Sequence, residues 1–137
     1  MAHVEASAHV RMEPDALWRR VGSFQGVGEW HPLLAKVEGR GEQPGSVRKA
    51  RTHNGEEQVE RLLEISPSRH FYRYAMVSSP MPLRSYVGDL RVRENQDGTS
   101  TVLWTSDFVA TQDDGATEAT IRGFLEAGME GLRERYR

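Results

Sequence analysis

Residues 85–110 read SYVGDLRVRENQDGTSTVLWTSDFVA, and this stretch decides the fold. Two runs rich in β-branched and aromatic residues, 85–95 and 99–110, flank the dipeptide Asp97-Gly98. Asp-Gly between such runs is typical of the tight turn of a β-hairpin, because both residues tolerate a positive φ. We therefore predict two long neighbouring strands that pair antiparallel.

The same pattern of strand-forming runs and turn residues extends back to residue 46. Asn54-Gly55 is a second hairpin signal, Pro67 ends the following run, and residues 80–84 are predicted to be a loop because they contain two prolines. The runs between these breaks are 46–53, 57–66 and 70–79. Because consecutive strands with short connections pair antiparallel, this part of the chain is predicted to form a meander.

The first forty residues predict a strand, two short helices and another strand. Pro14 is typical of the first turn of a helix, and Gly22 is expected to end that helix. Residues 23–34 contain glycines and Pro32 and are predicted to be a second short helix or turn, with a strand at 35–40. A first strand with one buried face is indicated by the alternation of Val4, Ala6, Ala8, Val10 and Met12.

Residues 114–136 predict one long helix, capped at its start by Asp113 or Asp114. Glycines at positions 123, 128 and 131 lie inside it, although glycine destabilises a helix by about 1 kcal/mol relative to alanine. They either allow the helix to pack closely on the sheet or leave an internal cavity open. The expected buried stripe comprises Ile121, Phe124, Leu125, Gly128, Leu132 and Tyr136.

Together these elements predict an α+β fold: a strongly curved seven-stranded antiparallel sheet around the long C-terminal helix, with two short helices after the first strand. The 137 residues contain no repeat, linker or low-complexity segment and suit one hydrophobic core, so we expect 1–137 to be a single domain. One helix does not easily fill the inside of such a sheet. An internal hollow behind Trp30 is therefore expected.

The composition excludes several classes of function. Without cysteine there is no disulfide and no thiolate nucleophile. The 18 Lys+Arg are spread along the chain, which argues against a nucleic-acid surface. The N-terminal residues do not resemble a signal peptide and no run has the length of a membrane span, so we expect a cytoplasmic protein without membrane insertion. No metal-ligand spacing, nucleophile motif or phosphate loop occurs, so neither metal nor cofactor is expected.

Several short motifs occur in the order and at the spacing found in a known superfamily. They are Trp18, Trp30-His31-Pro32, Gly45-Ser46-Val47-Arg48, Glu60-Arg61-Leu62, Tyr74, the segment PMPLRSY at 80–86, Gly88 and Val102-x-Trp104. Through them the chain resembles, from Val4 to Tyr136, the helix-grip (SRPBCC, START-like) superfamily. That superfamily includes START lipid-transfer domains, birch-pollen-type allergens and polyketide cyclases. Within it, the chain resembles the polyketide cyclase family 2 group, which is similar to the plant abscisic-acid receptors.

The resemblance implies an internal cavity that holds a small hydrophobic molecule. The loop that contains Pro80, Met81, Pro82 and Leu83 is expected to form the entrance. The implied ligand-binding residues are Trp30, His31, Lys36, Arg48, Glu60, Tyr74, Tyr86 and Trp104.

Two of these residues, His31 and Glu60, are the best candidates for acid–base catalysis, and each has a second interpretation. His31 either exchanges protons with a ligand or hydrogen-bonds the backbone and holds the turn before Pro32. The resemblance places Glu60 in the cavity, which requires a β-bulge near the Asn54-Gly55 turn. Simple alternation instead sends Glu60 to the solvent, opposite the face that carries Val59, Leu63 and Ile65.

Three functions are compatible with this pattern. The leading hypothesis is a protein that binds a lipid, a polyketide or a related aromatic in the cavity. The second is a cyclase or dehydratase in which His31, Glu60 or a tyrosine moves protons on a reactive substrate. The third is a ligand-gated subunit that contacts a protein partner through the entrance loop. Residues 52–57, THNGEE, lack the gate sequence of the hormone receptors, which disfavours a hormone-receptor role.

Overall fold

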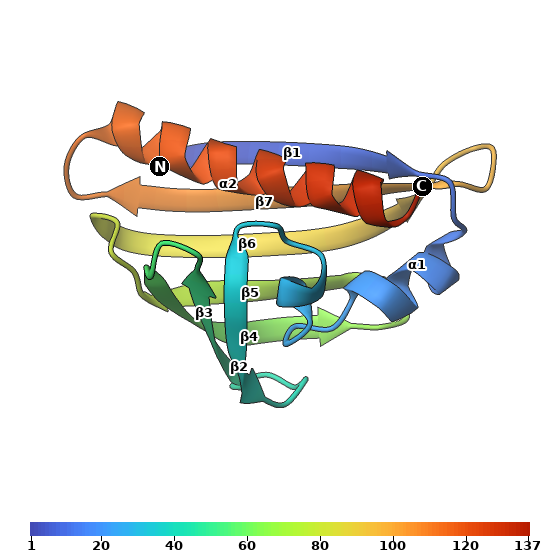
Figure 1. The fold of residues 1–137 in the computed structure, drawn as a ribbon, viewed down its shortest axis with the longest axis horizontal. Helices are drawn as coiled ribbons and strands as arrows, with labels where there is room; N and C mark the ends of the chain where they lie inside the picture. The colour runs from blue at the N-terminus through green and yellow to red at the C-terminus, as the bar shows by residue number, and fades with distance from the viewer.

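The computed structural model describes residues 1–137. It confirms the predicted fold: a curved antiparallel sheet of seven strands lies around a long C-terminal helix, and short helices follow the first strand (Figure 1). The strand order in the sheet is β1-β7-β6-β5-β4-β3-β2. The elements are β1 (Ala2–Val10), α1 (Pro14–Val21), the 3-10 helix η1 (Val27–Glu29), β2 (Leu34–Arg40), β3 (Val47–Thr52), β4 (Glu57–Ser66), β5 (Phe71–Ser78), β6 (Leu83–Glu94), β7 (Ser100–Ala110) and α2 (Asp114–Arg135).

Helix α1 begins and ends where the sequence predicts. Pro14 takes the first helical position, and the Glu13 carboxylate accepts the backbone N–H of Ala16 at 2.6 Å. Such a cap satisfies donors that the first turn of a helix leaves unpaired. At the other end, a Cβ on Gly22 would lie 2.3 Å from the ring of Trp18, so glycine allows the chain to leave the helix across that ring.

Three elements differ from the prediction at their ends. β1 stops at Val10 rather than Met12, because the N–H of Met12 donates to the carbonyl of Val10 in a turn that leads into α1. The expected second helix is only the short η1. β6 begins at Leu83, inside the predicted loop, because Leu83 pairs with Ala110 of the long strand β7.

Two of the three glycines in α2 serve close packing. A Cβ on Gly128 would lie 2.6 Å from the ring of Trp104, and one on Gly131 would lie 2.3 Å from the carbonyl oxygen of Trp30. Gly123 is exposed and has no neighbouring atom within 4 Å of its Cβ position, so packing does not require it. Neither α2 nor any other helix is long and apolar enough to cross a membrane.

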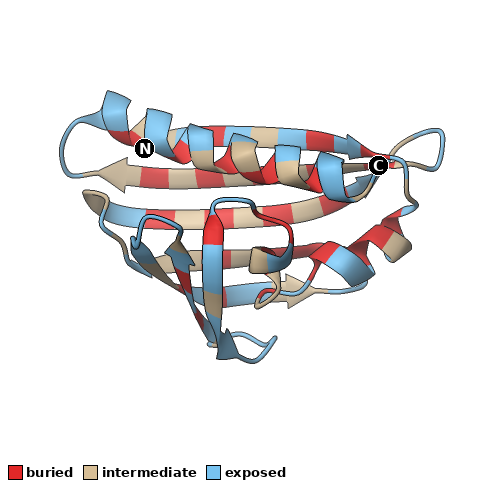
Figure 2. Ribbon diagram, in the orientation of Figure 1, coloured by how far each residue is buried: buried red, intermediate tan, exposed pale blue.

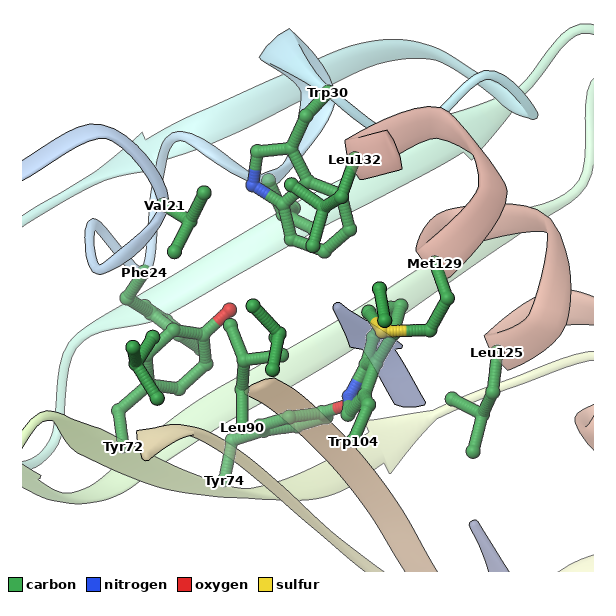
Figure 3. Close-up of a cluster of buried hydrophobic side chains, with 14 of the residues drawn as sticks. Val21, Phe24, Trp30, Tyr72, Tyr74, Leu90, Trp104, Leu125, Met129 and Leu132 are labelled. Atoms are coloured by element: carbon green, nitrogen blue, oxygen red, sulfur yellow. The ribbon is translucent and has the colours of Figure 1, made fainter. Parts of the chain in front are cut away.

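Buried residues alternate with more exposed ones along the strands and recur along α1 and α2 (Figure 2). In Figure 3 Trp30 lies beside Leu132 and Trp104 beside Met129, both of α2, and the cluster continues through Tyr74 and Leu90 to Tyr72 and Phe24. The rings of Trp30 and Trp104 meet edge to face with their centroids 5.5 Å apart. The expectation of a hollow behind Trp30 is therefore wrong: large aromatic side chains fill the volume that a single helix leaves.

Candidate ligand-binding site

A pocket of about 80 Å³ remains at the end of the sheet where α2 begins. Three parts of the chain surround it: the turn between β3 and β4, the loop between β5 and β6, and the first half of α2, which lie at the same end of the molecule in Figure 1. Its apolar walls come from Pro80 and Met81 in the loop and from Ile121 and Phe124 on α2. The pocket therefore offers an apolar surface to a ligand.

Glu60 provides a carboxylate at the inner side of this pocket. Glu60 is only 6% exposed, yet it lines the pocket together with Gln58 of the same strand. Its Oε1 accepts a hydrogen bond of 2.7 Å from Nε of Arg48, which lies directly opposite in the β3–β4 register. Its Oε2 accepts no hydrogen bond from the protein. One oxygen is thus fixed by the protein and the other is available to a ligand.

Arg48 is buried in the core and bonds Glu60 from the side away from the pocket. Its Nη1 donates to the carbonyl of Phe24 at 2.6 Å and to the hydroxyl of Tyr72 at 3.2 Å. Its guanidinium carbon lies 4.2 Å from the ring centroid of Phe24 and 4.8 Å from that of Tyr74, within the range of cation–π attraction. Burial by itself lowers the pKa of Arg48, but the Glu60 carboxylate together with the neighbouring Tyr72 and Tyr74 outweighs this effect and raises it. The guanidinium therefore stays protonated.

The alternative for Glu60 that the sequence left open is settled in favour of the interior. The pairing of β4 with β5 shifts register between Val59 and Glu60 and again between Leu62 and Glu64. Across Gln58 to Leu62 the side chains of β4 still alternate, with Glu60 and Leu62 inward, and Leu63 is exposed. The shift at Leu62/Glu64 leaves Leu63 unpaired and reverses the faces after it, so that Ile65 also packs against the core. Neither shift lies near the Asn54-Gly55 turn.

The two tyrosines predicted to bind the ligand, Tyr74 and Tyr86, are bonded within the protein. The hydroxyl of Tyr86, which lines the pocket, lies 2.5 Å from Oγ of Ser106, and the hydroxyl of Tyr74 accepts the indole N–H of Trp104 at 3.0 Å. Burial raises the pKa of Tyr86 to about 12 and that of Tyr74 well above its usual value. Both phenols are therefore neutral at physiological pH.

His31 is locked between the chain before β2 and helix α2. Its Nδ1 accepts the N–H of Leu33 at 3.2 Å, so its Nε2 carries the proton and donates to the carbonyl of Phe124 at 2.8 Å. Its ring stacks on that of Phe124, with centroids 4.0 Å apart. Burial lowers the pKa of His31 to about 4, so the imidazole is neutral at pH 7. This geometry matches the structural interpretation, in which His31 bonds the backbone.

Comparison with known proteins identifies the family. The profile of the family described as polyketide cyclase/dehydrase and lipid transport matches residues 1–137. The chain belongs to this family. No curated protein matches it. The resemblance inferred from short motifs is thus confirmed.

Solved structures show that the fold of this family member is shared widely. XoxI from Bacillus cereus superposes with a TM-score of 0.89 at 23% identity, covering 99% of this chain and 96% of XoxI. The Zhui aromatase/cyclase from Streptomyces gives 0.79 at 18% identity, with 98% and 93% covered. Major latex-like protein 151 from Panax ginseng gives 0.78 at 14% identity, with 98% and 97% covered. At these identities the likeness shows the helix-grip fold.

The structure separates the predicted site residues of this family member into groups. Glu60, Tyr86, Pro80 and Met81 line the pocket. Pro82 and Leu83 are partly buried beside it and do not line it. The remaining interior residues lie in the packed core behind the pocket; they are Trp30, His31, Arg48, Tyr74 and Trp104.

Lys36 does not face the interior, and the expectation that it does is wrong. Its side chain is 55% exposed and its Nζ lies 3.9 Å from the carboxylate of Glu38. A register shift between Leu34 and Lys36 in the pairing of β2 with β3 turns Leu34 inward and Lys36 outward. The pocket therefore has no lysine.

Sequence reasoning missed part of the lining. Ile121 and Phe124 belong to the predicted buried stripe, but which part of the helix covers the pocket depends on how α2 crosses the sheet. Gln58 could have been predicted as a lining residue, because it lies two residues before Glu60 and therefore on the same face of β4. Thr52 and Glu56, at the β3–β4 turn, had none.

Proposed function

We propose that the protein binds a small, mostly apolar molecule in this pocket, with Glu60 as the acceptor for its polar group. The observation that carries the proposal is the carboxylate of Glu60, which borders the pocket with one oxygen held by Arg48 and the other without a protein partner. The second oxygen of Glu60 is thus accessible at the pocket and can accept a hydrogen bond from a polar group of a bound ligand.

The apolar walls and the family support this proposal. Ile121, Phe124, Pro80 and Met81 offer carbon surface, and apolar contact is the main source of affinity in pockets of this kind. The family description names polyketide cyclases and lipid transport, which both concern largely apolar molecules. A lipid, a polyketide or a related aromatic remains the class of ligand that we propose.

The size of the pocket limits how such a ligand binds. Its volume of about 80 Å³ is small beside the roughly 300–1,000 Å³ typical of sites for drug-sized ligands. Either one end of the ligand enters while the rest stays in the mouth, or the β5–β6 loop moves outward. Met81 in that loop has a flexible, unbranched side chain that adapts to different shapes. We propose that the ligand enters past this loop.

A catalytic role has less support than binding. Both nitrogens of His31 are hydrogen-bonded to the backbone, and His31 does not line the pocket. Glu60 touches the pocket, but one of its two oxygens is already held by Arg48 in an ion pair. Binding is therefore the function that the geometry supports best.

Native mass spectrometry of freshly purified protein tests the proposal. We expect a complex heavier than the chain that releases a small molecule on denaturation. The variant Thr120→Phe, on the exposed rim of the pocket, should reduce the bound fraction, whereas its neighbour Ala119→Phe, which does not line the pocket, should leave it unchanged. Equal loading of both variants, or a protein that neither releases a ligand nor binds small aromatic probes, would contradict the proposal.

A further inference from the structure

We infer that the polar group of the ligand is a protonated amine attached to an apolar body. This inference rests on the proposed function of the pocket and goes further by naming the charge of the ligand. It is carried by the charges, the unpaired hydrogen-bonding atoms and the aromatic rings that the pocket presents.

The charged residues of the lining are all acidic. Glu56 at the rim and Glu60 inside line the pocket, and no lysine, arginine or histidine does. Arg48 is the nearest candidate cation, but it is 1% exposed and already bonds Glu60, Phe24 and Tyr72. A carboxylate or enolate ligand would thus meet two carboxylates without a free positive charge, and burying an unpaired charge is strongly unfavourable.

The hydrogen-bonding atoms that are left unpaired also favour a donor on the ligand. Oε2 of Glu60 has no protein donor, and Glu56 accepts a bond from Asn54 through Oε1 only. The hydroxyl of Thr120 donates to the carbonyl of Ala116 at 3.0 Å. Tyr86 and Ser106 bond each other. Of the lining side chains, the amide of Gln58 and the hydroxyl of Ser79 keep unpaired donors, and both are neutral groups that can accept as well.

The rings at the pocket add a third reason. Phe124 and Tyr86 line it from α2 and β6, and one face of the Phe124 ring is covered by His31. The faces of aromatic rings attract cations, and this attraction strengthens where water is excluded. An ammonium group next to Glu60 forms a charge-assisted hydrogen bond, while its carbon body contacts Ile121 and Met81. All three features are complementary to one ligand chemistry.

Three probes with the same phenylethyl body and different charge test the inference. They are 2-phenylethylamine, 2-phenylethanol and 3-phenylpropionate, titrated at pH 7 into the intact protein while chemical shifts are followed by NMR. We expect the amine to bind at least about tenfold more tightly than the alcohol, because a hydrogen bond between two charged groups is stronger than one to a neutral donor, and the carboxylate to bind most weakly.

Matched glutamate variants locate the source of this preference. Glu60→Gln should remove the advantage of the amine over the alcohol, and Glu56→Gln should reduce it by about twofold to fivefold, because its carboxylate is exposed at the rim. Glu57→Gln, on the outer face of the same strand and 3.9 Å from Lys49, should change nothing. If Glu60→Gln does not fold, the ranking of the three probes and the effect of Glu56→Gln decide.

The possible results distinguish the inference from the proposed function. If the alcohol or the carboxylate binds as tightly as the amine and shifts signals of pocket residues, the inference is overturned while the binding function stands. An amine preference that persists unchanged in both Glu56→Gln and folded Glu60→Gln also overturns it. If no probe shifts any signal of a pocket residue, the proposed function falls with the inference.

Discussion

Arg48 and Glu60 form an ion pair of 2.7 Å between β3 and β4, at positions that lie directly opposite in register. Arg48 packs against the ring of Phe24 in the core, whereas Glu60 borders the pocket. The pair is therefore the boundary between the filled and the hollow parts of the interior. Its stability and its charge bear on both the fold and the proposed ligand.

Replacing Arg48 tests how strongly the fold depends on this pair. Arg48→Met leaves Glu60 as a buried carboxylate without a counter-ion, and we expect the free energy of unfolding to fall by about 3–5 kcal/mol. Urea unfolding followed by tryptophan fluorescence measures the change. Lys49→Met, next in sequence and 48% exposed in its side chain, should change stability by less than about 1 kcal/mol.

The double variant Arg48→Met/Glu60→Leu separates the pair from its surroundings. Because removing both charges leaves no unpaired ion, it should be more stable than Arg48→Met alone. A double variant that is less stable than Arg48→Met would show that the Arg48–Glu60 interaction is not what matters at this position.

His31 makes the stability of the protein depend on pH. Burial lowers its pKa from 6.5 to about 4, so between these values the unfolded chain binds a proton that the folded chain does not. Above about pH 6.5, His31 therefore makes no pH-dependent change to the free energy of unfolding. As the pH decreases from 6.5 towards 4, protonation of the unfolded chain lowers the free energy of unfolding, by up to about 3 kcal/mol in total.

NMR titration of the histidine ring protons checks this directly. We expect one imidazole, that of His31, to titrate near pH 4, and this part of the pH dependence of unfolding to disappear in His31→Gln. His53→Gln, at an exposed position, should keep the wild-type profile. A His31 ring that titrates near pH 6.5 would mean that it is hydrated, against the buried geometry described above.

The glycines of α2 provide a matched pair of substitutions. Gly128→Ala places a Cβ 2.6 Å from the Trp104 ring and 2.8 Å from Cδ2 of His31, so we expect a loss of about 1–3 kcal/mol of stability. Gly123→Ala meets no atom within 4 Å and should stabilise the protein by about 0.5–1 kcal/mol through helix propensity. Thermal unfolding of both variants measures the difference, and equal effects would contradict the packing described for Gly128.

The fold was predictable because its signals are local. Asp97-Gly98 and Asn54-Gly55 mark hairpins, Pro14 marks the start of α1, and the spacing of apolar residues marks α2. Each of these patterns acts within a few residues, and short antiparallel connections then leave few topologies. How full the interior is depends instead on the combined volume of side chains from every element, so the packing around Trp30 was not predictable.

The site was predictable only in part, because it depends on register. The strands of Glu60 and Lys36 both contain register irregularities: the one at Leu62/Glu64 in β4 brings Ile65 to the same side as Glu60, and the other lies at Leu34/Lys36 in β2. A shift of one residue reverses the face of a side chain, and the alternation of sequence does not show where such shifts occur. The resemblance gave the right face for Glu60 and the wrong one for Lys36.

The position of the ligand is the most direct test of this account. Methyl NMR suits it, because the chain has only two isoleucines and five methionines. With the tightest-binding phenylethyl probe, we predict that the methyl signals of Ile121 and Met81 shift, while those of Met129 and the indole N–H of Trp30, both in the packed core, stay in place. Shifts at Met129 and Trp30 without shifts at Ile121 and Met81 would contradict the account.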